Sequence, residues 1–141
     1  MNIYEITARD YKTGKPITVK WNDDVIIDVK QVDNEAVSDI WIAPSLFDLQ
    51  INGFAGVDFQ DISINTKFLT KAVNNLQQSC CSKFLLTLIT DRWDRLIQKL
   101  KRLKELRDSN EILKNSIVGW HIEGPFLSER IGFCGTHNPS L

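Results

Sequence analysis

Long uninterrupted apolar runs are missing from this sequence. No stretch approaches the run of about 18 apolar residues that a membrane-spanning helix needs, so no membrane span is expected. The amino terminus also lacks the apolar core of a signal peptide, because Glu5, Arg9 and Asp10 interrupt it.

Cysteine is scarce, and a surplus of positive charge is absent. Cys80, Cys81 and Cys134 are three in number and unevenly spaced, which excludes a disulfide framework and a zinc-ribbon pattern and predicts a reduced, cytoplasmic protein. Lys and Arg total 17 against 18 Asp and Glu. A dedicated nucleic-acid binder would carry a basic surplus, so no nucleic-acid partner is expected.

The first part of the chain, residues 1–39, has the pattern of short strands. Residues 17–21 alternate apolar and polar side chains, and residues 3–7 and 25–29 are rich in isoleucine and valine. Turns are expected at residues 11–15 and 22–24. The prediction is a small antiparallel sheet whose apolar face needs a packing partner.

From residue 40 onward, strand patterns alternate with helix patterns. Strands are expected over residues 40–51, 84–89 and 117–123, with a helix around residues 68–76. A second helix follows Thr90 and Asp91, which we expect to cap it. Its apolar stripe consists of Trp93, Leu96, Ile97, Leu100, Leu103 and Leu106. Strand–helix alternation predicts an α/β fold with a parallel sheet.

Polar residues occur where the predicted parallel strands end, which is where α/β proteins build their sites. His121 and Glu123 are two apart on one strand, so their side chains point to the same side. A carboxylate and an imidazole there suit a divalent metal ion. The alternative is a buried Glu–His pair that satisfies only itself. The following Gly124 and Pro125 force a sharp exit from the strand and favour a built site.

Two further groups of residues carry polar side chains. Residues 132–139 contain Cys134, Thr136, His137 and Asn138 between glycines and a proline, a loop that could grip a polar ligand such as a sugar or could be an ordinary polar loop. Asp48, Gln50 and Asn52 are expected on one face of a strand, either lining a site or forming an internal hydrogen-bond network.

Together these motifs resemble the N-terminal part of the N-acetylglucosamine-6-phosphate deacetylases of the amidohydrolase superfamily. The resemblance rests on residues 43–53 (APSLFDLQING), 87–90 (TLIT), 119–127 (GWHIEGPFL) and 135–139 (GTHNP). It implies an α/β fold comprising the N-terminal part of a metal-dependent (β/α)8 barrel, residues 40–141, with its first three βα units. Residues 1–39 would supply N-terminal β-strands of a small β-sandwich domain.

The resemblance also implies roles for individual residues. Glu123 matches the metal-binding glutamate of the family, and Thr136 and His137 match positions that contact the sugar phosphate. His121, Gln50 and Asn52 match motif positions that line the site. Gln50 and Asn52 stand where many amidohydrolases carry two histidines, and an amide is a poor zinc ligand. The resemblance is therefore to a one-metal branch, with zinc expected and iron as the alternative.

The sequence also departs from the family pattern. Cys80 precedes the second barrel strand where a glycine is usual, so we expect Cys80 to adopt a different backbone conformation from glycine. Ser45 likewise replaces a usual glycine.

The implied activity is removal of acetate from N-acetylglucosamine 6-phosphate in amino-sugar catabolism, by an intact enzyme that is a homodimer. No catalytic residue is expected in this chain, because the general-base aspartate and two metal-binding histidines of the family lie on later strands. A closed barrel needs roughly 250 residues, so 141 residues predict a fragment that is inactive alone. The alternatives are another N-acyl amidohydrolase and a non-catalytic binding or assembly module ending at Leu141.

Overall fold

The computed structural model describes residues 2–23, 25–33, 39–130, 132–135, 137–138 and 140. The chain divides into two compact units, Met1–Pro44 and Ser45–Leu141. Within the described residues no helix has the length and apolarity to cross a membrane.

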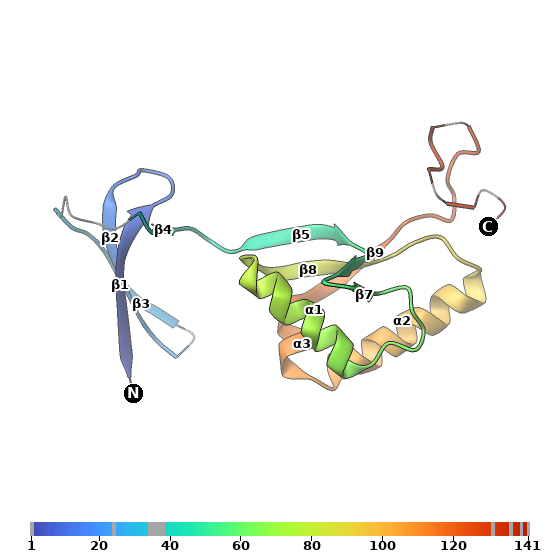
Figure 1. The fold of residues 1–141 in the computed structure, drawn as a ribbon, viewed down its shortest axis with the longest axis horizontal. Helices are drawn as coiled ribbons and strands as arrows, with labels where there is room; N and C mark the ends of the chain where they lie inside the picture. Colours follow the sequence, from blue (N-terminus) through green and yellow to red (C-terminus); the bar gives the residue numbers. More distant parts are fainter. Residues whose placement is uncertain are drawn as a thin grey trace. The chain divides into compact units, whose positions relative to one another are not determined.

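The first unit is a four-stranded sheet in the order β3-β2-β1-β4 (Figure 1). Its strands are β1 (Ile3–Asp10), β2 (Pro16–Asn22), β3 (Val25–Gln31) and β4 (Trp41–Ile42). β1, β2 and β3 pair antiparallel, as the alternating pattern predicted, and β4 joins β1 in parallel. The predicted turn around Gly14 is present, with Gly14 N donating to Asp10 O over 2.8 Å.

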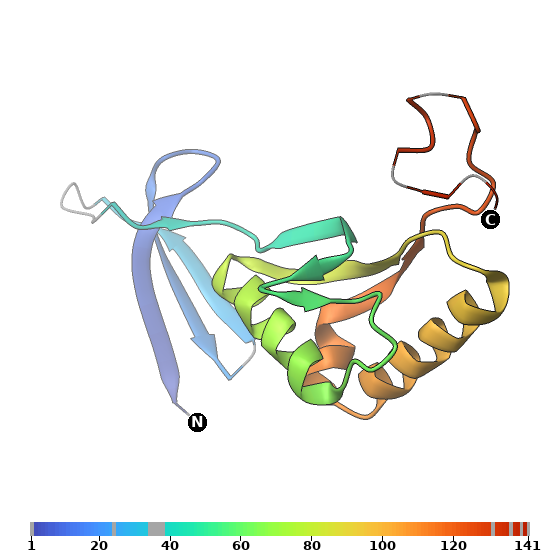
Figure 2. The ribbon, with the colours of Figure 1, turned by 45° about the vertical axis from the view of Figure 1, so that its right-hand side comes forward.

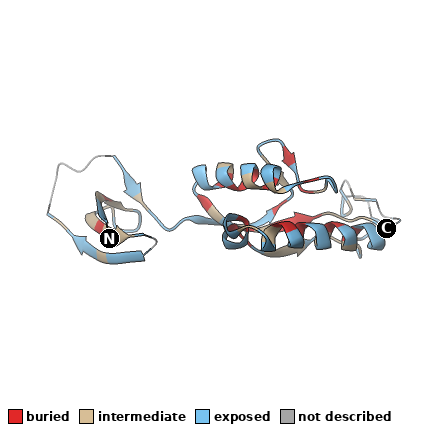
Figure 3. Ribbon diagram, turned by 90° about the horizontal axis from the view of Figure 1, so that it is seen from below, coloured by how far each residue is buried: buried red, intermediate tan, exposed pale blue. Residues whose placement is uncertain are grey.

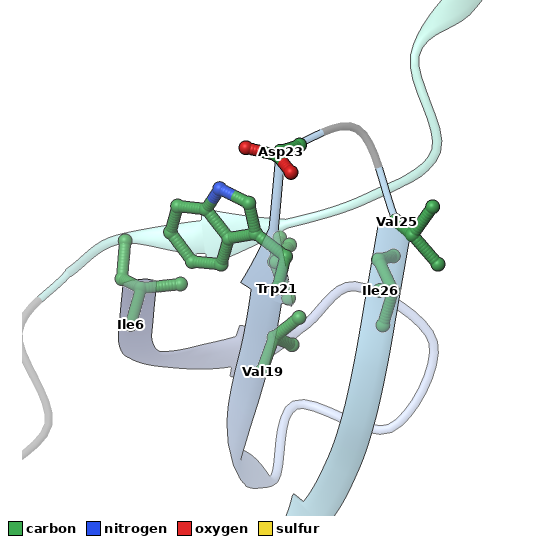
Figure 4. A pocket seen from close by; sticks show the side chains of 7 residues that line it. Ile6, Val19, Trp21, Asp23, Val25 and Ile26 are labelled. Atoms are coloured by element: carbon green, nitrogen blue, oxygen red, sulfur yellow. The ribbon is translucent and has the colours of Figure 1, made fainter. Parts of the chain in front are cut away.

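One face of this sheet carries an apolar groove (Figure 4). Ile6 of β1, Val19 and Trp21 of β2 and Ile26 of β3 line it, and Ile42 of β4 continues the same surface. Val25 and Ile26 are 60% and 64% exposed, so the apolar face expected from the sequence is largely uncovered within this unit.

The division between the units falls five residues later than the predicted boundary between residues 39 and 40. Residues 40–51, expected as one strand, form β4 and a separate strand, β5 (Leu46–Ile51), in different sheets. The reason is the pairing of β4 with β1: Arg9 N donates to Ile40 O over 2.9 Å, and Tyr11 N donates to Ile42 O over 3.1 Å. Pro44, which has no N–H to offer, follows this pairing.

The second unit is a parallel three-stranded sheet in the order β5-β8-β9. β8 (Cys81–Leu88) is the central strand and β9 (Ile117–Ile122) the third. Helix α1 (Thr66–Gln78) connects β5 to β8, and helices α2 (Trp93–Asp108) and α3 (Glu111–Ser116) connect β8 to β9. All three helices lie along one side of the sheet (Figures 1 and 2), as two crossovers of the same hand require.

The core of this unit lies between the helices and the sheet (Figure 3). Four residues of the predicted helical face of α1 are buried, Leu69, Ala72, Val73 and Leu76, whereas Phe68, also predicted there, is 50% exposed. Phe84, Leu86 and Leu88 of β8 meet that face and are fully buried. A short hairpin of β6 (Gly53–Phe54) and β7 (Val57–Asp58) lies between β5 and α1 in the chain. The mixed α/β class is confirmed. Within the described residues the parallel sheet has three strands and no barrel is closed.

Two local expectations were wrong, and both concern the start of α2. Thr90 and Asp91 do not cap the helix, whose N-cap residue is Arg92, with no side-chain hydrogen bond at the cap. Trp93 is 69% exposed and leaves the predicted stripe, whereas Lys99 is buried. The Asp91 carboxylate is engaged elsewhere, in an ion pair: Lys99 Nζ lies 2.8 Å from Asp91 Oδ2, and Arg95 Nε lies 3.8 Å from the same oxygen.

The pairing of Lys99 with Asp91 in a mostly buried place lowers the pKa of Asp91. The side chains of Lys99 and Asp91 are 8% and 14% exposed. The hydrogen bond from the Lys99 ammonium holds the pKa of Asp91 below its ordinary value of 3.8. A lowered carboxyl pKa contributes stability above the ordinary value, and this contribution is lost as the pH falls through the lowered pKa.

The expectation for Cys80 was also wrong. Cys80 has a φ of 63°, the left-handed conformation that glycine adopts most easily and that costs other residues roughly 1–2 kcal/mol. It follows Ser79, the C-cap residue of α1, and Cys80 N donates to Gln77 O over 3.0 Å. The cysteine therefore keeps a glycine-like turn at the end of α1.

The buried ion pair predicts a difference between two lysines of the same helix. Lys99→Met should lower the free energy of unfolding by about 3 kcal/mol, because Asp91 loses its nearest cation while staying mostly buried. Lys104→Met removes the solvent-exposed partner of Asp108 and should cost less than about 1 kcal/mol. Urea unfolding at about pH 7 measures both. The cost of Lys99→Met should shrink as the pH falls below the ordinary carboxyl pKa of 3.8. Equal costs for the two variants would contradict the buried pair.

The turn after α1 predicts a stabilising substitution. Cys80→Gly should raise the free energy of unfolding by about 0.5–1 kcal/mol, since relief of left-handed strain exceeds the added backbone entropy of glycine in the unfolded chain. Cys80→Ala is the matched control, because it removes the thiol and keeps the Cβ. Thermal unfolding of both variants checks this, and a gain in the alanine variant equal to that of glycine would assign the effect to the thiol.

Candidate functional site

A polar cluster lies at the carboxyl ends of β5, β8 and β9. Phe84, Leu86 and Leu88 of β8 face the helices, so by alternation Thr87 faces the other side of the sheet. His121 of β9 is paired in register with Thr87. The candidate site therefore occupies the side of the sheet away from the helices.

Glu123 is at the centre of this cluster. It comes directly after β9, where Glu123 N donates to Leu88 O over 2.9 Å and continues the pairing with β8. Gln50 Nε2 of β5 donates to its carboxylate Oε1, and His137 Nε2 lies 3.3 Å from Oε2. The Glu123 side chain is 14% exposed. One carboxylate thus meets groups from two distant parts of the chain.

His137 and Thr90 complete the cluster. His137 Nδ1 lies 3.1 Å from Thr90 Oγ1, and the same hydroxyl donates to the main-chain oxygen of Glu123 over 2.8 Å. The His137 side chain is 17% exposed. Its contact with Glu123 becomes an ion pair only when the imidazole is protonated. Thr90, expected as a helix cap, instead joins the loop of His137 to the end of β9.

His121 has a different partner from the one that the sequence suggested. Its Nδ1 lies 3.1 Å from Leu49 O of β5, so the ring reaches across β8. Both His121 and Glu123 contact β5, which agrees with their placement on one side of the strand. The imidazole beside the Glu123 carboxylate is that of His137, fourteen positions further along the chain.

Asp48, Gln50 and Asn52 do not line one regular strand face. The register of β5 shifts between Asp48 and Ile51, and Asp48 Oδ1 accepts a hydrogen bond from Gln50 N over 2.9 Å. Asn52 is exposed and lies between β5 and β6, where its main-chain oxygen accepts from Phe59 N. The irregularity brings Gln50, of these three, to Glu123. Thr136 lies outside the described residues.

Two further residues support the site, although the sequence pattern had not assigned them this role. Thr87, fully buried, accepts a hydrogen bond from Ile51 N through its hydroxyl over 2.8 Å. Gln60 donates from Nε2 to Thr87 O over 2.9 Å and accepts from Ile89 N over 3.2 Å. A threonine within the apolar run 84–89 was the available signal for the first. No sequence signal marked Gln60, because its role depends on how the segment after β7 packs beside β8.

The cluster has one carboxylate, that of Glu123, which can accept hydrogen bonds or bind a cation. Glu123 could serve as one ligand of a divalent ion, with Gln50 and His137 at its two oxygens. Within the described residues no group of three or more His, Cys, Asp and Glu side chains is placed to hold a metal ion. A catalytic zinc site commonly uses three protein ligands, so Glu123 fits as a single contributor.

The buried Thr87 hydroxyl predicts a local effect on the strand that carries Gln50. Thr87→Val should accelerate amide exchange of Ile51 by roughly 10- to 100-fold, because an unpaired buried N–H costs about 1–3 kcal/mol. Thr87→Ser keeps the hydroxyl and should leave this exchange slow. Native-state hydrogen exchange followed residue by residue measures both, and equal acceleration in the two variants would contradict the role of this hydrogen bond.

Comparisons with known proteins bear on this arrangement. No protein-family model matches the chain. An N-acetylglucosamine-6-phosphate deacetylase of Haemophilus influenzae is 35% identical over 99 residues, which are 70% of this chain and 24% of that protein. The chain thus spans about a quarter of the length of this curated relative.

Solved structures of the same name share the fold. The Pasteurella multocida deacetylase matches with a TM-score of 0.74 at 24% identity, over 99% of this chain and 38% of that one. A mutant of the Mycobacterium smegmatis deacetylase, in complex with N-acetyl-D-glucosamine-6-phosphate, matches with a TM-score of 0.76 at 22% identity, over 100% and 37%. The resemblance to the N-acetylglucosamine-6-phosphate deacetylases that the motifs predicted is therefore confirmed for this chain.

Proposed function

We propose that this chain is the N-terminal part of a metal-dependent hydrolase that deacetylates N-acetylglucosamine 6-phosphate to glucosamine 6-phosphate and acetate. The observation that carries the proposal is the arrangement at Glu123, where Gln50 and His137 converge on one carboxylate. The named relative supports the substrate, as does the phosphosugar complex of the M. smegmatis structure.

In this proposal Glu123 supplies one ligand of a single divalent ion, with zinc favoured over iron. Such an ion, when bound, would polarise the amide carbonyl and lower the pKa of a water molecule. Gln50 fixes the orientation of the Glu123 carboxylate by donating to Oε1. His137, whose Nε2 faces Oε2, together with Thr136 would contact the sugar phosphate. His121 and Asn52 would line the site, as the motif resemblance implies.

The larger architecture belongs to the same proposal. The parallel sheet of the second unit would be the first three strands of a (β/α)8 barrel, and the sheet of the first unit would contribute to a small β-sandwich. The general-base aspartate and the remaining ligands would come from later barrel strands. A homodimer in the cytoplasm is the expected form of the intact enzyme.

The alternatives are less well supported. The relatives reported above share one activity in their names, and no observation favours another N-acyl amidohydrolase or a non-catalytic module. Acetate release from phosphorylated and unphosphorylated N-acetylglucosamine separates the first alternative from the proposal.

The decisive experiment uses the full-length gene product with zinc. Glu123→Gln should lower acetate release from N-acetylglucosamine 6-phosphate by at least about 100-fold and reduce bound zinc. Glu129→Gln, which changes an exposed glutamate of the same loop, is the matched control and should keep both. The 141-residue chain alone should give no turnover. Full activity of Glu123→Gln would overturn the proposal, as would turnover by the 141-residue chain.

A further inference from the structure

Thr90 occupies a place that neither the motif resemblance nor the proposed reaction assigns to it. It follows β8, the central strand, and its hydroxyl touches two elements that are far apart in the chain. These are the main-chain oxygen of Glu123, at 2.8 Å, and Nδ1 of His137, at 3.1 Å.

The chemistry of a hydroxyl decides the direction of these two hydrogen bonds. A main-chain carbonyl oxygen can only accept, so the single hydrogen of Thr90 Oγ1 points to Glu123 O. Toward His137 the hydroxyl can then only accept, so Nδ1 must carry a hydrogen. The hydrogen bond at one ring nitrogen fixes the proton position and orientation of the imidazole.

This arrangement determines which ring atom faces Glu123. With Nδ1 held by Thr90, Nε2 is turned toward the carboxylate, 3.3 Å from Oε2. Both side chains are less than a fifth exposed, so little water is available to replace a lost partner. We propose that Thr90 is a positioning residue, which holds the His137 ring with a hydrogen on Nδ1 and with Nε2 directed at Glu123.

The backbone beside Thr90 is shaped for this close approach. A Cβ built on Gly124 would lie 2.1 Å from Thr90 Oγ1, well inside van der Waals contact. Gly124 also has a φ of 79°, which favours glycine. A side chain at position 124 would therefore displace the hydroxyl from its place between Glu123 and His137.

The chain provides an internal reference for the test. It contains two histidines, and His121 Nδ1 faces the main-chain oxygen of Leu49 at 3.1 Å. This nitrogen must also carry a hydrogen, because its partner can only accept. Thr90 contacts His137 and not this ring in any described interaction, so His121 should respond to no change at Thr90.

The experiment is nitrogen-15 NMR of the histidine rings in the 141-residue chain. Long-range proton–nitrogen correlations identify which ring nitrogen carries the hydrogen. In the wild type, both rings should show hydrogen on Nδ1. Thr90→Val, which keeps the side-chain shape, should shift or remove the Nδ1–H signal of His137 and leave that of His121. Thr90→Ser should restore the pattern of His137.

Further variants separate positioning from general stability. Gly124→Ala should have the same effect on His137 as Thr90→Val, although Thr90 is intact. Thr70→Val makes the same chemical change on α1 and should alter neither ring. Amide spectra report whether each variant is folded. A wild-type His137 without hydrogen on Nδ1, or a folded Thr90→Val variant with an unchanged His137 pattern, would overturn the proposal.

The role in catalysis rests on the proposed function, but the ring measurement does not. In the full-length gene product, Thr90→Val should lower acetate release at least tenfold and Thr90→Ser should recover most of it. If the NMR pattern follows the hydroxyl but no variant, including the wild type, releases acetate, the positioning stands and the proposed reaction fails.

Discussion

The parallel pairing of β8 with β5 on one side and β9 on the other is the constraint on which the described site depends. Because parallel strands end at the same edge, residues 50, 90 and 123 meet there although the chain separates them by two crossovers. The helices bury one face of this sheet with apolar side chains, and the opposite face keeps the polar groups. The pairing extends one residue past β9, through Glu123 N and Leu88 O, so the strand ladder itself fixes the main chain of Glu123.

Hydrogen bonds between side chains and the main chain hold the strands together at that edge. Thr87 receives the N–H of Ile51, and Gln60 bonds on both sides of Leu88 in the way a further strand would. These contacts replace strand pairing where β5 loses its register. A bulged strand is expected beside a site, because the bulge redirects one side chain. Here the redirected side chain is Gln50.

Much of the fold could be predicted, because the spacing of apolar residues along the sequence indicates it. The buried face of α1 and the apolar run of β8 follow from sequence spacing. The split between β4 and β5 did not, since both halves are apolar and pairing with β1 decides it. The six-residue α3 is too short for a periodic pattern, although Asn110 marks its start. The burial of Lys99 does not follow from the apolar stripe, because it depends on the ion pair with Asp91, which lies outside the helix. The motif around Glu123 predicted it as a site residue. Its contact with His137 could not be predicted, because it depends on the path of a loop.

The approach of Gly124 to Thr90 has a consequence for how such sequences diverge. A Cβ at position 124 and a hydroxyl at position 90 compete for one volume, so the two positions cannot drift independently. A descendant that gained a side chain at 124 would be tolerated chiefly with a smaller residue at 90, and it would then need another acceptor for His137 Nδ1. Substitutions at these two positions, 34 apart in the chain, should therefore depend on each other, although neither residue supplies a group to the Glu123 carboxylate.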